Sequence, residues 1–133
     1  MAERIIFRMA AWTDAAGKYD PNAPLEGNED NYYIDDDLGD NTPSHWVADE
    51  DILLSDYGML MAVADGMGGM NAGEIASQIA HDTVAEFFAP GKITPQLAAN
   101  HENRSRYMEE VVRETDRRIK AEAKGNSYHE GMG

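Results

Sequence analysis

The amino-acid sequence predicts an α+β fold in which antiparallel β-sheet is covered on one face by two long helices. Short apolar runs with strand character fill the first 65 residues, and stretches with helical spacing fill most of the remainder. A glycine-rich turn at residues 66–69 separates the two regions. Strands followed by helices are typical of α+β domains, in which the helices gather on one side of the sheet.

Composition narrows the classes of function. The chain has 133 residues and is 42% hydrophobic, which suits one domain with a real core. Its net charge of −14 argues against nucleic acids and anionic membranes as partners. The absence of cysteine excludes disulfides and thiolate catalysis. Arg8 interrupts the N-terminal apolar run, so we do not expect a signal peptide. No stretch of the sequence is apolar over the length of a membrane span, and we expect a cytoplasmic location.

The expected strands come first along the chain. Residues 4–13 and 31–35 each predict a strand, and a turn-rich loop separates them. Residues 35–43 form an acidic loop that no core could bury, and a solvated loop is a better interpretation of it than a calcium site. Residues 52–55 and 59–64 predict a hairpin around Asp56-Tyr57-Gly58.

The expected helices follow the glycine-rich turn. Asn71 and Glu74 resemble a capping box, and the apolar face that follows ends at Pro90-Gly91. Thr94-Pro95 predicts the start of another helix, with a break at residues 101–105. Its apolar stripe then runs from residue 107 to residue 119, and Gly125 predicts its end.

Two acidic sites lie at strand ends. Glu29 and Asp30 precede the second strand, and Asp65 ends the fourth. If these strands are neighbours, their carboxylates converge on one sheet edge and repel unless they are protonated or bound to a hard cation. Oxygen ligands without His or Cys favour Mg²⁺, Mn²⁺ or Ca²⁺, and the Gly66 carbonyl could add a further ligand. The simpler alternatives are a helix-capping role for Asp65 and plain surface charge for Glu29-Asp30.

Three motifs in this region together resemble the metal-dependent protein serine/threonine phosphatases of type 2C. They are Asn28-Glu29-Asp30-Asn31, Val63-Ala64-Asp65-Gly66-Met67-Gly68-Gly69 and Ala72-Gly73-Glu74-Ile75-Ala76-Ser77. The resemblance spans roughly residues 4–133 and is strongest over 28–36 and 58–80. It implies an α-β-β-α sandwich with a two-metal site at one end. Because family domains are roughly twice as long, residues 1–133 would be the N-terminal part of one such domain, about half of the sandwich.

The resemblance also implies roles for individual residues. Glu29, Asp65 and the Gly66 carbonyl would hold one Mg²⁺ or Mn²⁺, and Asp65 would bridge to a second. Asp30 would orient the attacking water, so Asp30 and Asp65 would be the catalytic residues. The implied reaction is hydrolysis of phosphoserine or phosphothreonine in a phosphoprotein substrate, by attack of water that bridges the two cations.

The sequence departs from the family pattern at several positions. Leu25 stands where the family usually has an arginine that grips phosphate. Met67 replaces a histidine of the animal members and is common in bacterial members, which suggests a bacterial type. The single Asp-Gly, at 65–66, leaves the second metal under-ligated, so we expect the chain alone to be inactive or weakly active.

Two further functions and one further interaction remain open. The first function is a pseudophosphatase-like binding or regulatory module, which Leu25 favours, and the second is an acidic cation-binding protein unrelated to phosphatases. A half-sandwich would leave an apolar sheet face exposed. We therefore expect self-association through that face, by exchange of strands between copies.

Overall fold

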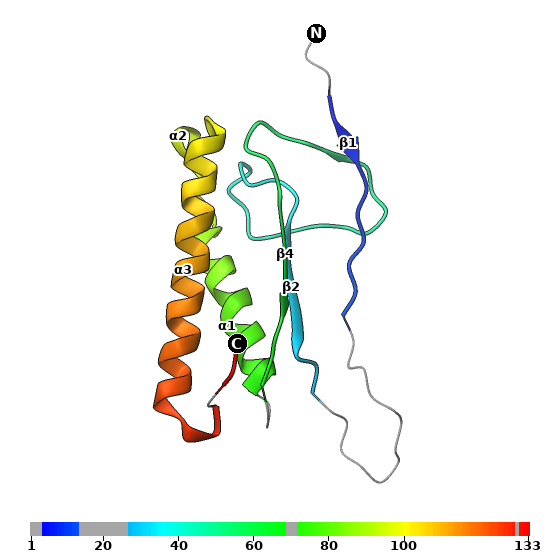
Figure 1. Cartoon of the computed structure of the whole chain (residues 1–133). Coiled ribbons are helices and arrows are strands. Elements are labelled where there is room, and N and C mark those ends of the chain that lie inside the picture. Colours follow the sequence, from blue (N-terminus) through cyan, green and yellow to red (C-terminus); the bar gives the residue numbers. More distant parts are fainter. Residues whose placement is uncertain (1–3, 14–26, 69–71, 130) are drawn as a thin grey trace.

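The fold is α+β, as the sequence predicts, and the computed structural model describes residues 4–13, 27–68, 72–129 and 131–133. The elements, in chain order, are β1 (Ile6–Phe7), β2 (Asp30–Asp35), β3 (Ile52–Leu53), β4 (Leu60–Asp65), α1 (Ala72–Phe87), α2 (Pro95–Ala98), α3 (His101–Gly125) and the 3₁₀ turn η1 (Ser127–His129). Figure 1 shows the helices gathered on one side of the strands. No helix within the described ranges is long and apolar enough to cross a membrane.

Strands β2 and β4 form the sheet that positions the site. They pair antiparallel from Asp30 opposite Asp65 to Asp35 opposite Leu60. Side chains alternate between the two faces of a strand. Leu60 is therefore buried toward the helices, whereas Met61 and Val63, which are 61% and 83% exposed, lie on the opposite face. This exposed apolar face agrees with the expected half-sandwich, and its self-association stays a prediction.

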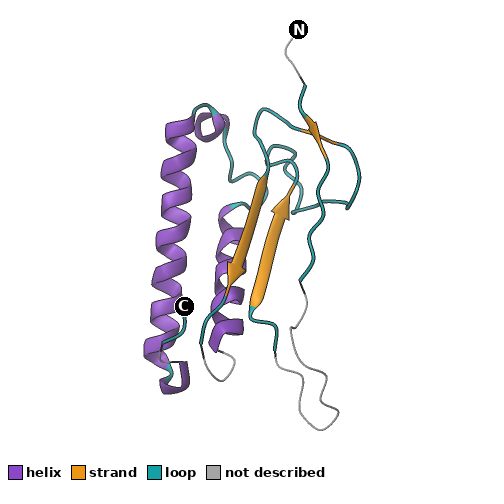
Figure 2. Cartoon of the chain, turned by 45° about the vertical axis from the view of Figure 1, so that its right-hand side comes forward, coloured by secondary structure: helices purple, strands orange, loops and turns teal. Residues whose placement is uncertain are grey.

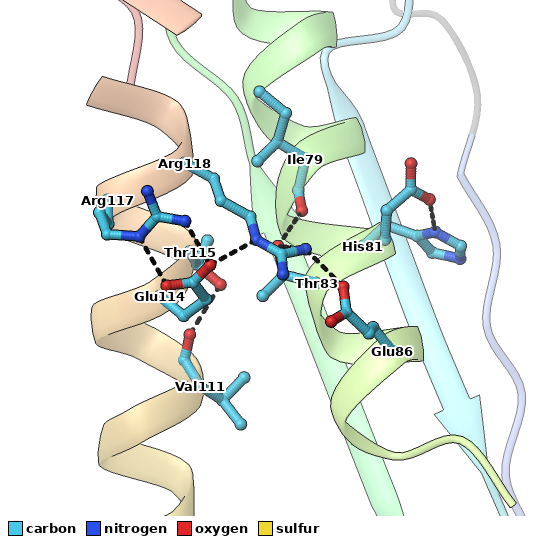
Figure 3. Close-up of polar contacts among 10 residues, drawn as sticks. Ile79, His81, Thr83, Glu86, Val111, Glu114, Thr115, Arg117 and Arg118 are labelled. Atoms are coloured by element: carbon cyan, nitrogen blue, oxygen red, sulfur yellow. Dashed lines mark hydrogen bonds and ion pairs between the residues drawn. The ribbon is translucent and has the colours of Figure 1, made fainter. Parts of the chain in front are cut away.

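Helix α1 packs on both strands of this sheet, and α3 packs beside α1 (Figure 2). The buried contact between the helices is apolar, and Val111 of α3 is 2% exposed. Polar contacts bind the helices further along. The Arg118 guanidinium donates to Glu86 of α1 at 2.7 Å and to Glu114 of its own helix at 2.7 Å (Figure 3). The contact with Glu86 joins α3 to α1.

Two expectations about element boundaries are wrong. Residues 52–55 do not form a hairpin with β4, because β3 pairs instead with β1, with Ile6 opposite Leu53. The turn between β3 and β4 instead contacts the acidic loop. The Ser55 hydroxyl donates to the Asp37 carboxylate at 2.7 Å, and the Leu38 N–H donates to the Gly58 carbonyl at 3.0 Å. The strand expected over residues 4–13 is correspondingly reduced to the two residues of β1.

The helix boundaries also differ in part from expectation. Residues 101–105 are helical, and the interruption lies just before them, because the Asn100 side chain caps α3 by accepting from the Asn103 N–H at 2.9 Å. Thr94 caps α2 in the same way, and α3 ends at Gly125, as predicted. The expected capping role of Asn71 lies outside the described residues.

Candidate metal site

The strand register brings the two acidic sites of the sequence together. Asp30 lies directly opposite Asp65 where β2 begins and β4 ends. The ladder extends one residue further, because the Gly66 N–H donates to the Glu29 carbonyl at 3.0 Å. The register thus places the backbones of Glu29, Asp30, Asp65 and Gly66 at the same end of the β2–β4 pair, and the convergence of their ligands on a metal stays a prediction.

Local hydrogen bonds fix the chain where it enters β2. The Asn28 side-chain oxygen accepts from the Asp30 N–H at 3.0 Å, as in an Asx turn. The Asn28 amide nitrogen donates in turn to the Thr13 hydroxyl at 2.8 Å. Glu29 is thus held between an anchored asparagine and the ladder bond to Gly66.

Gly73, in the first turn of α1, marks the point where two potential ligands converge. A Cβ atom at Gly73 would lie 2.8 Å from Glu29 Oε1 and 2.9 Å from the Gly66 carbonyl oxygen. The separation of those two oxygens therefore cannot exceed the sum of these distances, 5.7 Å. A glycine here keeps open the space that both oxygens border, so its role in the site follows from the absence of a side chain.

Gly66 is constrained even more tightly. A Cβ at this position would lie 2.0 Å from the Gly73 carbonyl oxygen and 2.6 Å from the Glu29 carbonyl oxygen. Both neighbours are backbone atoms, which cannot rotate away. The contact between the end of β4 and the start of α1 thus requires a glycine at residue 66.

The carboxylates of the site have few partners in the protein. Glu29 is half-buried, and Asp30 and Asp65 are exposed. Within the described ranges, no side-chain hydrogen bond or ion pair reaches any of these three carboxylates. The Glu29 carboxylate lies at the first turn of α1, where the helix dipole favours negative charge. That dipole accounts for the position of Glu29 but leaves Asp30 and Asp65 without compensation.

The available donors suit a hard cation. Two carboxylates and one backbone carbonyl are the oxygen ligands that Mg²⁺, Mn²⁺ and Ca²⁺ accept. Glu29, Asp65 and Gly66 could hold such an ion, with Asp30 beside them. In the part of the chain that the structure describes, no group of three or more His, Cys, Asp or Glu side chains is arranged to hold a metal. The described residues therefore bring Glu29 Oε1 and the Gly66 carbonyl oxygen close together without forming a complete group of ligands.

The acidic loop at the other end of β2 satisfies its own carboxylates. Asp37 Oδ1 accepts from the Gly39 N–H at 2.9 Å and from the Ser55 hydroxyl at 2.7 Å. Asp40 accepts from the backbone and hydroxyl of Thr42 at 2.8 and 2.6 Å. Asp35 is 4% exposed, and burial, reinforced by the charge of Asp40, raises its pKa to about 6. The expectation that no core could bury this loop is therefore wrong for Asp35, which is buried at the end of β2, whereas Asp37 and Asp40 are stabilised by hydrogen bonds within the loop.

Sequence reasoning missed two features beside the site. The first is the role of Gly73, which keeps a side chain out of the space between Glu29 and the Gly66 carbonyl. Its position shortly after the Asp-Gly motif could have indicated this role. The second is a contact of the chain end, where Met67 and Gly133 exchange two backbone hydrogen bonds of 2.6 and 2.9 Å. Met132 is buried against Ala72 and Ala76 of α1. Leu25, the expected phosphate-gripping position, lies outside the described residues.

Comparisons with known proteins found no relatives. The chain matches no family model, and no curated protein or solved structure matches it significantly.

Proposed function

We propose that residues 1–133 are the N-terminal part of a metal-dependent protein serine/threonine phosphatase of type 2C. In this proposal Glu29, Asp65 and the Gly66 carbonyl hold Mg²⁺ or Mn²⁺. The observation that supports it best is the convergence of Glu29 Oε1 and the Gly66 oxygen on the space beside Gly73. The pairing of Asp30 with Asp65 at the same end of the sheet adds two carboxylates that have no side-chain partner among the described residues.

The chemistry divides between the ions and the side chains. When bound, Mg²⁺ or Mn²⁺ would supply a water acidic enough to attack at neutral pH and positive charge beside the phosphoryl oxygens. Asp65, at the end of β4, would be one of the carboxylates that hold the ions. Asp30, opposite it, accepts a hydrogen bond from the attacking water and aims it at the phosphorus of a phosphoserine or phosphothreonine substrate. Gly66 and Gly73 keep side chains out of the space where these groups meet.

The chain alone supplies too few ligands for two ions. Only Glu29 and Asp65 contribute acidic ligands, so we expect the isolated chain to bind one cation and to turn over phosphate esters weakly or not at all. The pseudophosphatase alternative predicts a folded partner-binding surface without turnover even in a longer chain. The cation-binding alternative predicts binding of a cation with no phosphatase activity in any context.

Calorimetric titration with Mn²⁺ tests the site. We expect one ion to bind the wild type, and Asp65→Asn and Glu29→Gln each to weaken binding at least about tenfold, since ligands matter at least as much as the groups that orient them. Asp56→Asn removes an exposed turn carboxylate and serves as the matched control. No heat for the wild type, or an equal loss in the control, would contradict the proposal.

A second variant tests the geometry without removing any charge. Gly73→Ala places a methyl group between Glu29 and the Gly66 carbonyl, so it should weaken Mn²⁺ binding although all acidic residues remain. Hydrolysis of p-nitrophenyl phosphate by wild type and Asp65→Asn then tests the reaction. Strong turnover by the isolated chain that is lost in Asp65→Asn would support phosphate-ester hydrolysis at this site. It would contradict the expectation that the isolated chain supplies too few ligands for two ions.

A further inference from the structure

One hydrogen bond beside the proposed cation site fixes the direction of the Gly66 carbonyl. This carbonyl and the Met67 N–H belong to the same peptide group, and a planar trans peptide group points its oxygen and its N–H in opposite directions. The Met67 N–H donates to the Gly133 carbonyl at 2.6 Å, and the Gly133 N–H donates to the Met67 carbonyl at 2.9 Å. With that N–H held by Gly133, the Gly66 oxygen points the other way, toward Gly73, where a Cβ atom would lie 2.9 Å from it.

The hydrogen bond of the Gly66 N–H acts on a different peptide group. It runs to the Glu29 carbonyl and holds the peptide group that precedes Gly66. Because Gly66 has no side chain, its backbone can adopt a wide range of conformations. Rotation of the following peptide group would turn the Met67 N–H toward the space that Glu29 Oε1 borders, and an N–H group does not bind a cation. The bond to Gly133 therefore selects the orientation that offers an oxygen.

A tight turn leads the chain from α3 back toward the site. The Met132 N–H donates to the His129 carbonyl at 3.2 Å across Gly131, whose φ of 81° is a conformation that favours glycine. The buried His129 ring lies beside α3, with Nδ1 at 3.2 Å from the Glu122 carboxylate. The segment is red in Figure 1, where it turns back from the end of α3 toward α1.

The Met132 side chain anchors this turn against the start of α1. Met132 is 8% exposed and packs against Ala72 and Ala76, which are 0% and 1% exposed. Ala72 directly precedes Gly73, the residue whose missing side chain leaves room for Glu29 Oε1 and the Gly66 oxygen. One short segment thus contacts both the helix start and the strand end that border the site.

We propose that residues 131–133 are a positioning segment that orients the Gly66 carbonyl toward the cation site. The inference rests on the proposed function for the role of Gly66 and assigns a role to residues outside the ligand set. Gly133 acts through its hydrogen bonds to Met67, and Met132 acts by holding Gly133 in place. Groups that orient metal ligands typically change metal affinity about 10–100-fold when they are removed.

Calorimetric titration with Mn²⁺ tests the effect on affinity. Met132→Ala leaves every acidic residue in place but removes the packing that holds Gly133. Its affinity should fall about tenfold, the change expected if a tenth of the molecules keep the carbonyl in the binding orientation. Met132→Leu conserves the volume of the side chain and should bind like the wild type. Gly133→Pro removes the N–H that donates to the Met67 carbonyl without opening a cavity, so it should also weaken binding if Met132→Ala fails to fold.

The matched control is Ile93→Ala, a truncation in the other core cluster. Ile93 is 6% exposed, so its loss should lower stability much as Met132→Ala does, while Mn²⁺ affinity stays unchanged. Titration at a temperature where circular dichroism shows each variant folded separates affinity from stability. Wild-type affinity in both Met132→Ala and Gly133→Pro, or an equal loss in Ile93→Ala, would overturn the proposal.

Amide hydrogen exchange tests the orientation without any metal. In the wild type the Met67 amide should exchange slowly, because it donates to Gly133. In Met132→Ala it should exchange at least about tenfold faster while the amides of the β2–β4 ladder stay protected. An unprotected Met67 amide in the wild type would overturn the positioning role. A protected Met67 amide in a wild type that binds no Mn²⁺ would instead contradict the proposed function and leave the fixed orientation of Gly66 standing.

Discussion

The two ends of strand β2 both carry clustered carboxylates, but only one end leaves them without partners. At its C-terminal end, Asp37 and Asp40 accept hydrogen bonds from nearby backbone and hydroxyl groups. At its N-terminal end, no described residue donates to the side chains of Asp30 or Asp65. Equal charge thus has different consequences. A carboxylate satisfied by its own loop has little to offer a ligand, whereas one held at a rigid strand end without a donor can bind a cation.

The largest expected effect concerns the backbone at the N-terminal end of β2. Gly66→Ala forces a methyl group against the Gly73 and Glu29 carbonyl oxygens, so it should cost at least about 3 kcal/mol of unfolding free energy. Thermal unfolding followed by circular dichroism measures it. Gly125→Ala is the control. A Cβ atom at Gly125 would meet no other part of the protein within 4 Å, so this substitution should be neutral or stabilising. Equal stability of both variants would show that the close contact is absent in solution.

The C-terminal end of β2 should show itself in the pH dependence of stability. Burial raises the pKa of Asp35 to about 6, so the folded state retains this proton where the unfolded state, near pKa 3.8, has lost it. Stability therefore falls as pH rises from about 4 to 6. Asp35→Asn removes this loss and should be more stable at pH 7 by up to about 3 kcal/mol.

Urea unfolding of both proteins at pH 4 and pH 7 measures this difference. A gap between variant and wild type that does not widen with pH would contradict the burial of this carboxyl group.

Cation binding should stabilise the protein only through the N-terminal end of β2. Mn²⁺ at a hundredfold excess over its Kd should add about 2.7 kcal/mol to the wild type. Glu29→Gln should lose this gain in unfolding free energy. Asp40→Asn should keep it, because Asp40 lies in the acidic loop and is hydrogen-bonded to Thr42. Unfolding free energies with and without Mn²⁺ measure both. Loss of the gain in Asp40→Asn instead would reverse the assignment of the two ends.

The smallest effect expected is the loss of one hydrogen bond in the acidic loop. Ser55→Ala removes the hydroxyl that donates to Asp37 at 2.7 Å, which should cost about 1 kcal/mol. Mn²⁺ affinity should not change, because the site lies at the other end of β2. A calorimetric titration beside the unfolding curve checks both statements, and a change in affinity would show that the two ends are coupled.

Local sequence predicted the parts of the molecule that local chemistry decides. The apolar run before Asp65, the glycines after it and the caps at Thr94 and Gly125 each act over a few residues, and the corresponding strand and helix ends are confirmed. The pairing of Asp30 with Asp65 could also be predicted, because both residues lie at strand ends and paired strands bring such ends together.

The rest depended on contacts between distant segments. The pairing of β3 with β1 follows from the attachment of Ser55 and Gly58 to the acidic loop, which no hairpin signal at residues 56–58 discloses. The need for a glycine at residue 73 depends on how close the Glu29 side chain comes to the first turn of α1. Neither distance can be read from residue spacing.

Paramagnetic broadening by Mn²⁺ compares the two ends of β2 in one experiment. In amide NMR spectra of the wild type, substoichiometric Mn²⁺ should first remove the signals of Asp30, Gly66 and Gly73, while those of Gly39 and Thr42 persist. Asp65→Asn should abolish this selectivity. If the signals of the acidic loop disappear first, or if both ends broaden equally, the N-terminal end of β2 is not the cation site.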